Sequence, residues 1–430
     1  MKPMPLRAAA ILAAVAVIAS SAHAENWPQW RGPHFNGSSG ETDLPTTFSP
    51  DDNVTWKATL PGLGASTPIV WGDCVFVTAQ VPHSRDLWAL CLDRGDGSVR
   101  WRKPMGRGFG NKQGNTGASP SAITDGKTVW FYFGTGELVA FDFGGNERWR
   151  RNIAKDHGPF DLLWAYGSTG LLYEGVLHIP VIHGPMRGQT KPGGIGFLLG
   201  VDPATGKDLW KQARPSEAER ECVQAYTTPI PFEVGDRKRI LLIGADHATA
   251  HEAASGKEVW RSPTYNPAKD PNFRAVVSPV VIGGKVLVCA PRGGQRFYAA
   301  EVGKEGWVWT KREHAPDVCT PLLYEGRVYV LVGDHRMIFC MDPATGKTLW
   351  KGDLGGKTKY QASPTGADGK IYCINMKGEA VVLAAGDAFK VLHRAEMGGG
   401  DCRASIAVSD GQLFVRTDAR VYCIGKRRGR

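Results

Sequence analysis

The sequence predicts an all-β protein, an eight-bladed β-propeller of four-stranded antiparallel blades closed by an N-terminal strand that completes the last blade. Three observations predict it: a tryptophan-ended motif recurs along the chain, a Ser/Thr-Pro pair recurs with it, and the two ends of the repeat region are complementary fragments. A content of 42% hydrophobic residues excludes intrinsic disorder. The 54 Gly and 28 Pro residues follow no three-residue period, which excludes a collagen-like rod.

The first repeated motif is a tight turn between two strand-like segments, ending in tryptophan. Residues 342–350 (DPATGKTLW) closely repeat residues 202–210 (DPATGKDLW). Apolar residues lead into the Thr-Gly turn and Trp ends the second segment, which is typical of a hairpin. Weaker copies occur at 93–101 and 252–260, and degenerate ones at 142–149, 301–309 and 384–392.

The second motif is Ser or Thr followed by Pro, a glycine-containing turn and an alternating strand. It places two further strands before each hairpin, so one repeat holds four strands, A to D, with Ser/Thr on A and Trp on D. Its copies are Thr67-Pro68, Ser119-Pro120, Thr228-Pro229, Ser278-Pro279, Thr320-Pro321 and Ser363-Pro364, with Thr169-Gly170 and Ser405-Ile406 in the same place without proline.

The tryptophans on the D strands indicate how many blades the chain forms. They are predicted to dock between neighbouring blades, where burial of one indole contributes on the order of 2 kcal/mol. Residues 53–56 form a D strand with no A, B or C before it, and 403–424 supply A, B and C with no D after them. Joining these ends closes an eight-bladed ring in one domain. The predicted structural residues are Trp56, Trp101, Trp149, Trp210, Trp260, Trp309 and Trp350, with Leu392 in the eighth place.

The repeat units Asp-x-x-Thr-Gly-x-x-x-Trp resemble the tryptophan-docking repeats of pyrroloquinoline quinone (PQQ)-like β-propellers, which have a WD40/YVTN-like repeat architecture. That superfamily contains quinoprotein dehydrogenases and cofactor-free relatives, including the propeller lipoprotein of the outer-membrane β-barrel assembly machinery. Residues 27–33 (WPQWRGP) are similar to the start of exported bacterial PQQ-like repeat proteins. The resemblance covers nearly the whole chain after residue 24 and implies the fold; activity depends on the site.

Residues 1–24 are predicted to be a cleaved signal peptide. Lys2 and Arg7 precede an apolar run at 8–18, and Ala22-His23-Ala24 is a small-x-small cleavage pattern with the cut after Ala24. An uncleaved signal anchor is the alternative. The run is too short to span a bilayer, and no Cys follows the cut to carry a lipid anchor. We therefore expect an exported, periplasmic or extracellular protein of the cell envelope.

The remaining chain divides into a leader at 25–52 that packs on the propeller, the propeller at 53–425 and a basic tail at 426–430. The formal net charge is +10, but Lys2, Arg7 and the tail contribute much of it. The charge therefore does not indicate a nucleic-acid-binding face. We expect a monomer with no membrane span.

The nine cysteines show no cofactor motif. Cys91, Cys340 and Cys423 occupy a slot two residues before the repeat turn, where other copies have Ala or Gly, so we interpret them as compact core fillers. No Cys-x-x-Cys-His is present, so no haem c is attached. No two cysteines are adjacent, so the vicinal disulfide that the resemblance associates with many PQQ alcohol dehydrogenases is missing. A disulfide between outlying cysteines stays open. No metal site is predicted, and His247 and His251 are interpreted as hairpin residues.

A ligand site is expected at the channel mouth where A strands begin, because the longest loops share that face. These are the D-to-A connections 102–117, 150–168, 211–227 and 261–277 and the B-to-C loop 183–196. Arg274 and Arg403 could bind carboxylates, and Asp317 or Asp401 could act as a base or a Ca²⁺ ligand. The candidate lip residues are Asn115, Trp164, Tyr166, Gln224, Tyr226, Arg274, Asp317, Tyr360, Gln361, Asp401 and Arg403.

The function predicted from these features is a non-catalytic binding or scaffold propeller that recognises an envelope protein or polymer through its long-loop face. No catalytic residues and no cofactor belong to this prediction. One alternative is a PQQ- and Ca²⁺-dependent dehydrogenase of alcohols or sugars. Another is a carbohydrate-binding module in which Trp164, Tyr166 and Tyr226 stack on sugars. A water-filled polar channel without a ligand is the structural alternative.

Overall fold

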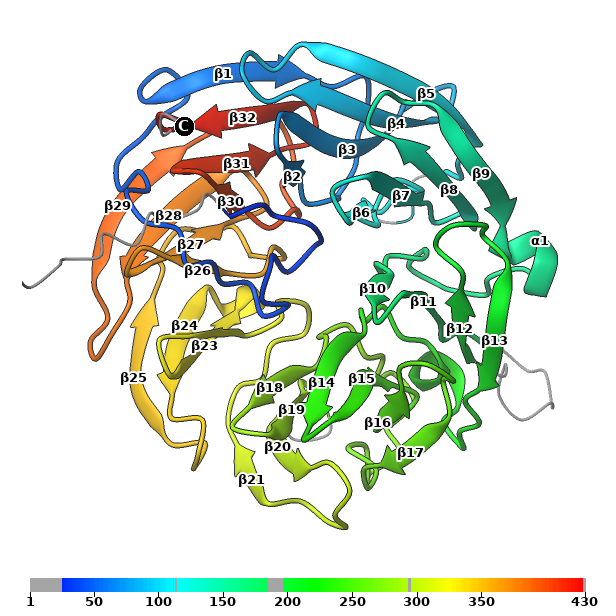
Figure 1. The fold of residues 1–430 in the computed structure, drawn as a ribbon. Coiled ribbons are helices and arrows are strands. Elements are labelled where there is room, and N and C mark those ends of the chain that lie inside the picture. The colour runs from blue at the N-terminus through cyan, green and yellow to red at the C-terminus, as the bar shows by residue number, and fades with distance from the viewer. Residues whose placement is uncertain (1–24, 111, 113, 185–195, 293–294, 428–430) are drawn as a thin grey trace, which may run out of the picture.

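The computed structural model describes residues 25–110, 112, 114–184, 196–292 and 295–427. In this part of the chain the strands form eight four-stranded antiparallel sheets arranged around a central axis (Figure 1), which confirms the predicted propeller. The predicted signal peptide (1–24), the end of the basic tail (428–430) and most of the enlarged B-to-C loop (185–195) lie outside the described residues. No described helix is long and apolar enough to cross a membrane.

The strands follow the predicted A-to-D order in each blade. Blades 1 to 4 consist of β2 (Ile69–Trp71), β3 (Cys74–Gln80), β4 (Asp86–Asp93) and β5 (Val99–Arg107); β6 (Ile123–Thr124), β7 (Thr128–Tyr132), β8 (Glu137–Asp142) and β9 (Glu147–Asn152); β10 (Leu171–Tyr173), β11 (Val176–Val181), β12 (Phe197–Val201) and β13 (Asp208–Ala213); and β14 (Ile230–Val234), β15 (Arg237–Gly244), β16 (His247–Glu252) and β17 (Glu258–Arg261).

Blades 5 to 8 consist of β18 (Val280–Ile282), β19 (Lys285–Ala290), β20 (Arg296–Glu301) and β21 (Trp309–Arg312); β22 (Leu322–Tyr324), β23 (Arg327–Val332), β24 (Met337–Met341) and β25 (Thr348–Asp353); β26 (Thr365–Ala367), β27 (Lys370–Ile374), β28 (Glu379–Ala384) and β29 (Val391–Glu396); and β30 (Ala407–Ser409), β31 (Gln412–Arg416), β32 (Arg420–Ile424) and β1 (Val54–Thr59). The D-to-A and B-to-C loops carry helix α1 (Ile153–His157) and the 3₁₀ turns η1 (Arg220–Val223) and η2 (Gly333–His335).

Closure of the ring follows the predicted scheme. β1 pairs antiparallel with β32, with Val54 opposite Ile424 and Thr59 opposite Arg420. Most residues of the B and C strands are buried, whereas D strands such as β13 alternate between exposed and half-buried residues. The D strands are therefore the outer edges of the blades, and β1 protects β32 in the same way that other D strands protect their C strands.

Each D-strand tryptophan faces the small-residue slot of its own C strand and reaches the turn of the next blade. Trp149 lies opposite Ala140, and its Nε1 donates to the carbonyl of Pro203 at 2.9 Å. A Cβ on Gly206, in that next turn, would lie 2.5 Å from the Trp149 ring. The slot partners of the other docking tryptophans are Cys423, Cys91, Gly200, Ala250, Ala299 and Cys340, opposite Trp56, Trp101, Trp210, Trp260, Trp309 and Trp350.

All nine cysteines are free thiols and all are buried. The three in the slot are therefore explained by contact with an indole directly across the hairpin. No disulfide joins the other cysteines, which are buried as free thiols in the strands and in the D-to-A loops.

In blades 1 to 7 a backbone N–H at the start of the A strand donates to a hydroxyl of the next blade. The backbone N–H of Thr67 donates to Oγ of Ser121 at 2.9 Å, and Ser121 N–H donates to Oγ1 of Thr169 at 3.1 Å. In the second blade the linking residue is thus Ser121, two residues after the Ser119 that the Ser-Pro pair indicated. The chain of bonds continues through Thr228, Ser278, Thr320, Ser363 and Ser405.

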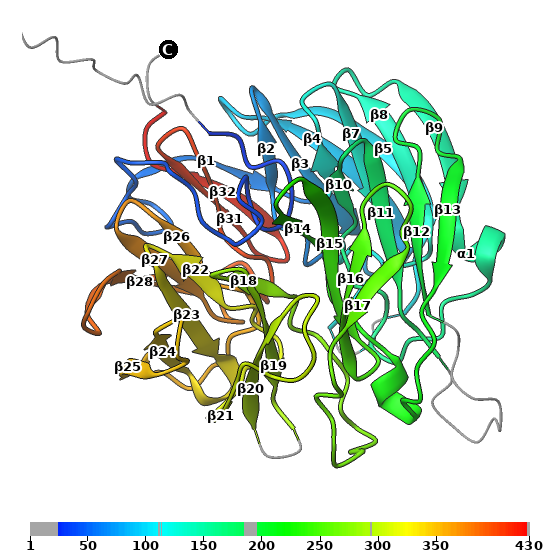
Figure 2. The ribbon, with the colours of Figure 1, turned by 60° about the horizontal axis from the view of Figure 1, so that its bottom comes forward.

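The leader at 25–52 crosses the inner strands at the end of the channel opposite the long loops. Trp27 exchanges two backbone hydrogen bonds with Val70 of β2, at 2.8 and 3.0 Å, and Gly37 accepts one from Gly366 of β26. Figure 1 shows the first part of the leader, in dark blue, over the inner part of the ring of blades, and in Figure 2 it lies at the same end as the C-terminus. This path directs Trp30 and Arg31 toward the channel.

Candidate functional site

A cavity of about 490 Å³ occupies the channel between the long-loop face and the leader. Trp30 of the leader lines it from the opposite end, hydroxyls of the inter-blade chain line its walls, and residues of D-to-A and B-to-C loops line its mouth. Its principal polar lining residues are Trp30, Asn115, Ser119, Ser121, Trp164, Thr169, Tyr226, Thr228, Arg274, Arg292, Asp317, Asp334, Lys359, Gln361, Ser363, Arg403 and Ser405.

Seven of the eleven candidate lip residues line this cavity, and the structure brings them together from seven different D-to-A connections. The other four do not line it. The seven lining residues are Asn115, Trp164, Tyr226, Arg274, Asp317, Gln361 and Arg403, and the four that lie elsewhere are Tyr166, Gln224, Tyr360 and Asp401.

The four residues that do not line the cavity are buried or bonded to other residues of the protein. The hydroxyl of Tyr166 donates to the carbonyl of Pro180, and its ring packs edge-on against Tyr132. Gln224 is fully buried and donates to the carbonyl of Gly184 at 2.9 Å. Tyr360 is buried, and Asp401 pairs with Lys377 at 3.1 Å on the outer surface. They support the loops that carry the lip.

The register of the A strand explains why Tyr166 and Tyr360 do not line the cavity. In all eight blades the residue two positions before the residue that makes the inter-blade contact lines the cavity, because alternate residues of an extended segment share one side. Tyr166 and Tyr360 each lie one position before such a lining residue, whereas Gln224 and Asp401 lie two positions before one and are held by the contacts given above. The eight equivalent residues are Ala65, Ser119, Gly167, Tyr226, Val276, Val318, Gln361 and Arg403.

Four successive D-to-A loops meet at one arginine. The guanidinium of Arg274 pairs with Asp317 Oδ2 at 3.0 Å and with Glu221 Oε1 at 3.4 Å. Glu221, in η1, also accepts a hydrogen bond of 2.6 Å from the indole N–H of Trp164, and Arg274 lies over that indole at 5.2 Å from the ring centroid. Salt bridges and stacking together hold this side of the mouth in one geometry.

A second polar group contains Tyr226. Its hydroxyl donates to Oε1 of Gln224 at 3.0 Å and accepts the backbone N–H of Trp164 at 3.2 Å. Burial raises the pKa of the Tyr226 hydroxyl far above its ordinary value, so it stays protonated. With Tyr166 buried and Arg274 covering Trp164, the three aromatic side chains do not present the stacking platform that a carbohydrate module requires.

Cations exceed carboxylates in the lining. Arg274, Arg292, Lys359 and Arg403 line the cavity, against two carboxylates, Asp317 and Asp334. Arg292 lies 3.9 Å from Asp317 and Lys359 lies 3.9 Å from Asp334, while Arg403 donates to Asn115 at 3.1 Å. Oδ1 of Asp317 is buried without a hydrogen-bond partner among the described residues. The cavity therefore suits an acidic ligand that also has one hydrogen-bond donor.

The residues of the mouth do not fit PQQ with Ca²⁺. Calcium requires six to eight oxygen ligands, mostly carboxylates and carbonyls. Glu221 and Asp317 are both held by Arg274, and Asp334 faces Lys359. Among the described residues, no three His, Cys, Asp or Glu side chains are placed to hold a metal. Arginines could hold the carboxylates of PQQ, but the described residues of the mouth offer its calcium no set of oxygen donors.

Several lining residues were not identified from the sequence. Trp30 belongs to the leader, whose position no repeat predicts. Lys359 lies in the D-to-A loop before blade 7, two residues before the lining residue Gln361. Three more lining residues follow the B strands of blades 5, 6 and 7, namely Arg292, Asp334 and Met376. An alignment of the B-to-C turns, like the one made for the turns that end in tryptophan, would have located them.

His251 lies in β16, and both of its ring nitrogens are hydrogen-bonded. Burial lowers its pKa to about 4.

A family model described as outer membrane protein assembly factor BamB matches residues 42–162 and 196–430. These ranges contain seven complete blades, part of another and the closing strand. Tetrathionate hydrolase of Acidithiobacillus ferrooxidans is 30% identical over 361 residues, which are 68% of this chain and 68% of that protein. Polyvinylalcohol dehydrogenase of a Sphingopyxis species is 25% identical over 395 residues, 81% of this chain and 54% of that protein.

Among solved structures, BamB from Moraxella catarrhalis superposes with a TM-score of 0.60 at 15% sequence identity. The superposition covers 86% of this chain and 98% of that one. At this identity the likeness shows the fold alone. The chain is therefore similar to proteins named for assembly, hydrolysis and dehydrogenation, and the site must distinguish among these functions.

Proposed function

Since this chain belongs to the family described as outer membrane protein assembly factor BamB, we propose that it is an exported binding propeller of the cell envelope that docks an acidic segment of a protein partner in the channel mouth. The observation that carries the proposal is the cationic cavity on the long-loop face, with four basic and two acidic side chains in its lining. Export rests on the signal-like residues 1–24, which we propose are cleaved after Ala24.

The geometry suits recognition of a peptide segment. An acidic side chain can pair with Arg403, Arg292 or Lys359, whose contacts include an amide oxygen at 3.1 Å and carboxylates at 3.9 Å. A backbone or side-chain N–H of the same segment can donate to Oδ1 of Asp317. Arg274 is held by two carboxylates and serves to position the loops. Complementary charge raises the association rate and the specificity of such an interface.

The test compares charge reversal on the two faces. Arg292→Glu with Lys359→Glu changes the mouth, where both side chains are partly exposed, and Lys207→Glu with Lys347→Glu makes the same charge change in C-to-D turns of the opposite face. A photoreactive residue at position 292 identifies the partner in whole cells. Reciprocal capture of that partner should fall at least about tenfold for the mouth variant and not for the matched control. Equal capture by both variants would refute the proposal.

A second candidate is hydrolysis of a small sulfur-oxygen dianion. Two observations favour it: the excess of cations in the cavity and the 30% identity to tetrathionate hydrolase over 68% of both chains. The experiment incubates purified protein with tetrathionate and quantifies its consumption by ion chromatography, with Arg403→Ala as the cavity variant. Consumption that is lost in the variant supports this candidate, and a wild-type protein that leaves tetrathionate unchanged eliminates it.

The quinoprotein alternative is addressed by titration with PQQ and Ca²⁺. Because the carboxylates of the mouth are paired with cations, we expect no saturable binding that depends on calcium. Sub-micromolar, calcium-dependent binding followed by dye-linked oxidation of an alcohol would replace the binding proposal with a dehydrogenase.

A further inference from the structure

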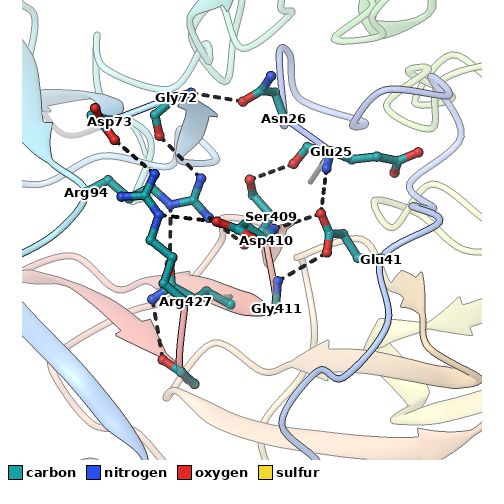
Figure 3. Close-up of polar contacts among 12 residues, drawn as sticks. Glu25, Asn26, Glu41, Gly72, Asp73, Arg94, Ser409, Asp410, Gly411 and Arg427 are labelled. Carbon is teal, nitrogen blue, oxygen red and sulfur yellow. Dashed lines mark hydrogen bonds and ion pairs between the residues drawn. The ribbon is translucent and has the colours of Figure 1, made fainter. Parts of the chain in front are cut away.

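The backbone nitrogen of Glu25 lies 2.6 Å from Oε1 of Glu41, at the seam between the leader and the last blade (Figure 3). Glu41 is only 3% exposed. Its carboxylate also accepts the backbone N–H of Asp410 at 2.8 Å and that of Gly411 at 3.1 Å, in the turn between β30 and β31. One buried carboxylate thus joins the first described residue to the blade that closes the ring.

The other polar atoms of Glu25 hold this nitrogen in place. Its carbonyl accepts a hydrogen bond of 2.6 Å from the hydroxyl of Ser409. Its carboxylate accepts hydrogen bonds from the hydroxyl of Ser39 at 2.5 Å and from the backbone N–H of Gly40 at 2.8 Å. Oε1 of the same carboxylate lies 3.4 Å from Nε2 of His34. With both the carbonyl and the side chain anchored, the nitrogen has little freedom to leave Glu41.

We propose that Glu41 is the binding site for the α-amino group of Glu25, created when a signal peptidase hydrolyses the Ala24–Glu25 bond. Water supplies the hydroxyl of the new carboxyl group on Ala24 and the hydrogen of the new amine on Glu25. The amine is protonated at neutral pH, since α-amino groups have a pKa near 8. This inference rests on the cleavage proposed above but not on the ligand of the cavity.

Cleavage changes the chemistry of the contact without moving its atoms. In the precursor, the Glu25 nitrogen is a neutral amide with one hydrogen. In the processed chain it is a cationic ammonium with three, and a charge-assisted hydrogen bond to a buried carboxylate is markedly stronger than a neutral one. The signal peptide would thus be removed at a position whose new end the fold already accommodates.

The surrounding contacts connect this pair to the closure of the ring. Arg94 of blade 1 donates to the carbonyl of Ser409 at 2.7 Å and to Oε1 of Gln412 at 3.2 Å. Arg427 pairs with Asp410 at 3.2 Å and with Asp73 of blade 1 at 2.9 Å (Figure 3). The turn that Glu41 holds is therefore one of the places where blade 8 contacts blade 1, so the new ion pair stabilises the seam as well as the leader.

The experiment compares the processed chain beginning at Glu25 with the same chain beginning at Ala24, both released from a fusion that leaves no added residue. The extra residue moves the amine about 3.8 Å along the chain and restores an amide at Glu25. We expect the unfolding equilibrium constant in urea to be about tenfold larger for the chain beginning at Ala24. In a Glu41→Gln background this difference should disappear, whereas Glu305→Gln, at an exposed position, should leave it unchanged.

A second measurement does not depend on the folding of a variant. In the native processed chain, the α-amine should react with an acylating reagent at least about tenfold more slowly than in the chain beginning at Ala24, because it is held at Glu41. Three results would overturn the proposal: an exported protein whose N-terminus, by mass spectrometry, is not Glu25; equal acylation rates; or a stability difference that persists unchanged in Glu41→Gln.

Discussion

The backbone N–H of Thr67 donates a hydrogen bond of 2.9 Å to the hydroxyl of Ser121 in the neighbouring blade. Six more bonds of the same kind continue around the channel to Ser405, at 2.9 to 3.2 Å. Between blade 8 and blade 1 the contact is made by the guanidinium of Arg416, which donates to the carbonyls of Ser66 at 3.2 Å and Thr78 at 2.6 Å. The inner end of the propeller is therefore joined from blade to blade by polar contacts.

Breaking one bond of this chain should destabilise the whole domain. Thr320 is buried and accepts from Ser278 N–H at 3.1 Å. Thr320→Val keeps the shape of the side chain but leaves that N–H without an acceptor. We therefore expect the free energy of unfolding, measured in urea, to fall by about 1–3 kcal/mol. Thr320→Ser retains the acceptor and should lose less than half as much. Equal losses in the two variants would show that packing, and not the hydrogen bond, matters there.

The contact between tryptophan and glycine can be tested with a matched pair of substitutions. Gly206 has a φ of +73°, and a Cβ there would lie 2.5 Å from the Trp149 ring. Gly175 has a φ of +71° but open space around it. Both changes to Ala incur the same backbone strain, about 1 kcal/mol, whereas Gly206→Ala must also displace the indole. We expect its melting temperature to fall by at least twice as much as that of Gly175→Ala.

Asp246 should make the stability depend on pH. Burial raises its pKa from 3.8 to about 6, against a hydrogen bond from Asn266 that lowers it. The folded state therefore binds the proton more tightly than the unfolded state, and stability contributed by this group is lost as pH rises from about 4 to about 6. Asp246→Asn should be more stable than wild type at pH 7, by up to about 3 kcal/mol, and equal to it near pH 4. A constant difference across this range would contradict the assignment.

The thiols should be protected until the protein unfolds. All nine cysteines are buried and free, so a thiol reagent should titrate nine groups in denaturant and almost none in the native state. Cys74 is the expected site of residual reaction, because a hydrogen bond from Cys91, assisted by the nearby Arg100, lowers its pKa to about 7. Cys74→Ser should remove that residual reaction. Fewer than nine groups in denaturant would reveal a disulfide.

The number of blades, their A-to-D order and the closing strand were predictable from the sequence, because each depends on local strand and turn patterns that repeat. The small slot at Cys91, Cys340 and Cys423 was also visible as a column of aligned residues, and its cause became clear when each was found opposite a tryptophan. The location of the candidate site on the long-loop face could be proposed for the same reason.

The members of that site were only partly predictable. Tyr360 and Gln361 are adjacent and both polar, yet only Gln361 lines the cavity, since a shift of one residue along an extended segment turns the side chain to the other side. Trp30 and Glu41 belong to a leader without a repeat to align, and Glu41 binds Asp410 and Gly411, which lie 369 and 370 residues further along the chain. The sequence by itself determined the repeating frame of this protein, while the tertiary structure decided which side chains face the channel and where the leader packs on the ring, because those contacts join segments that no local pattern relates.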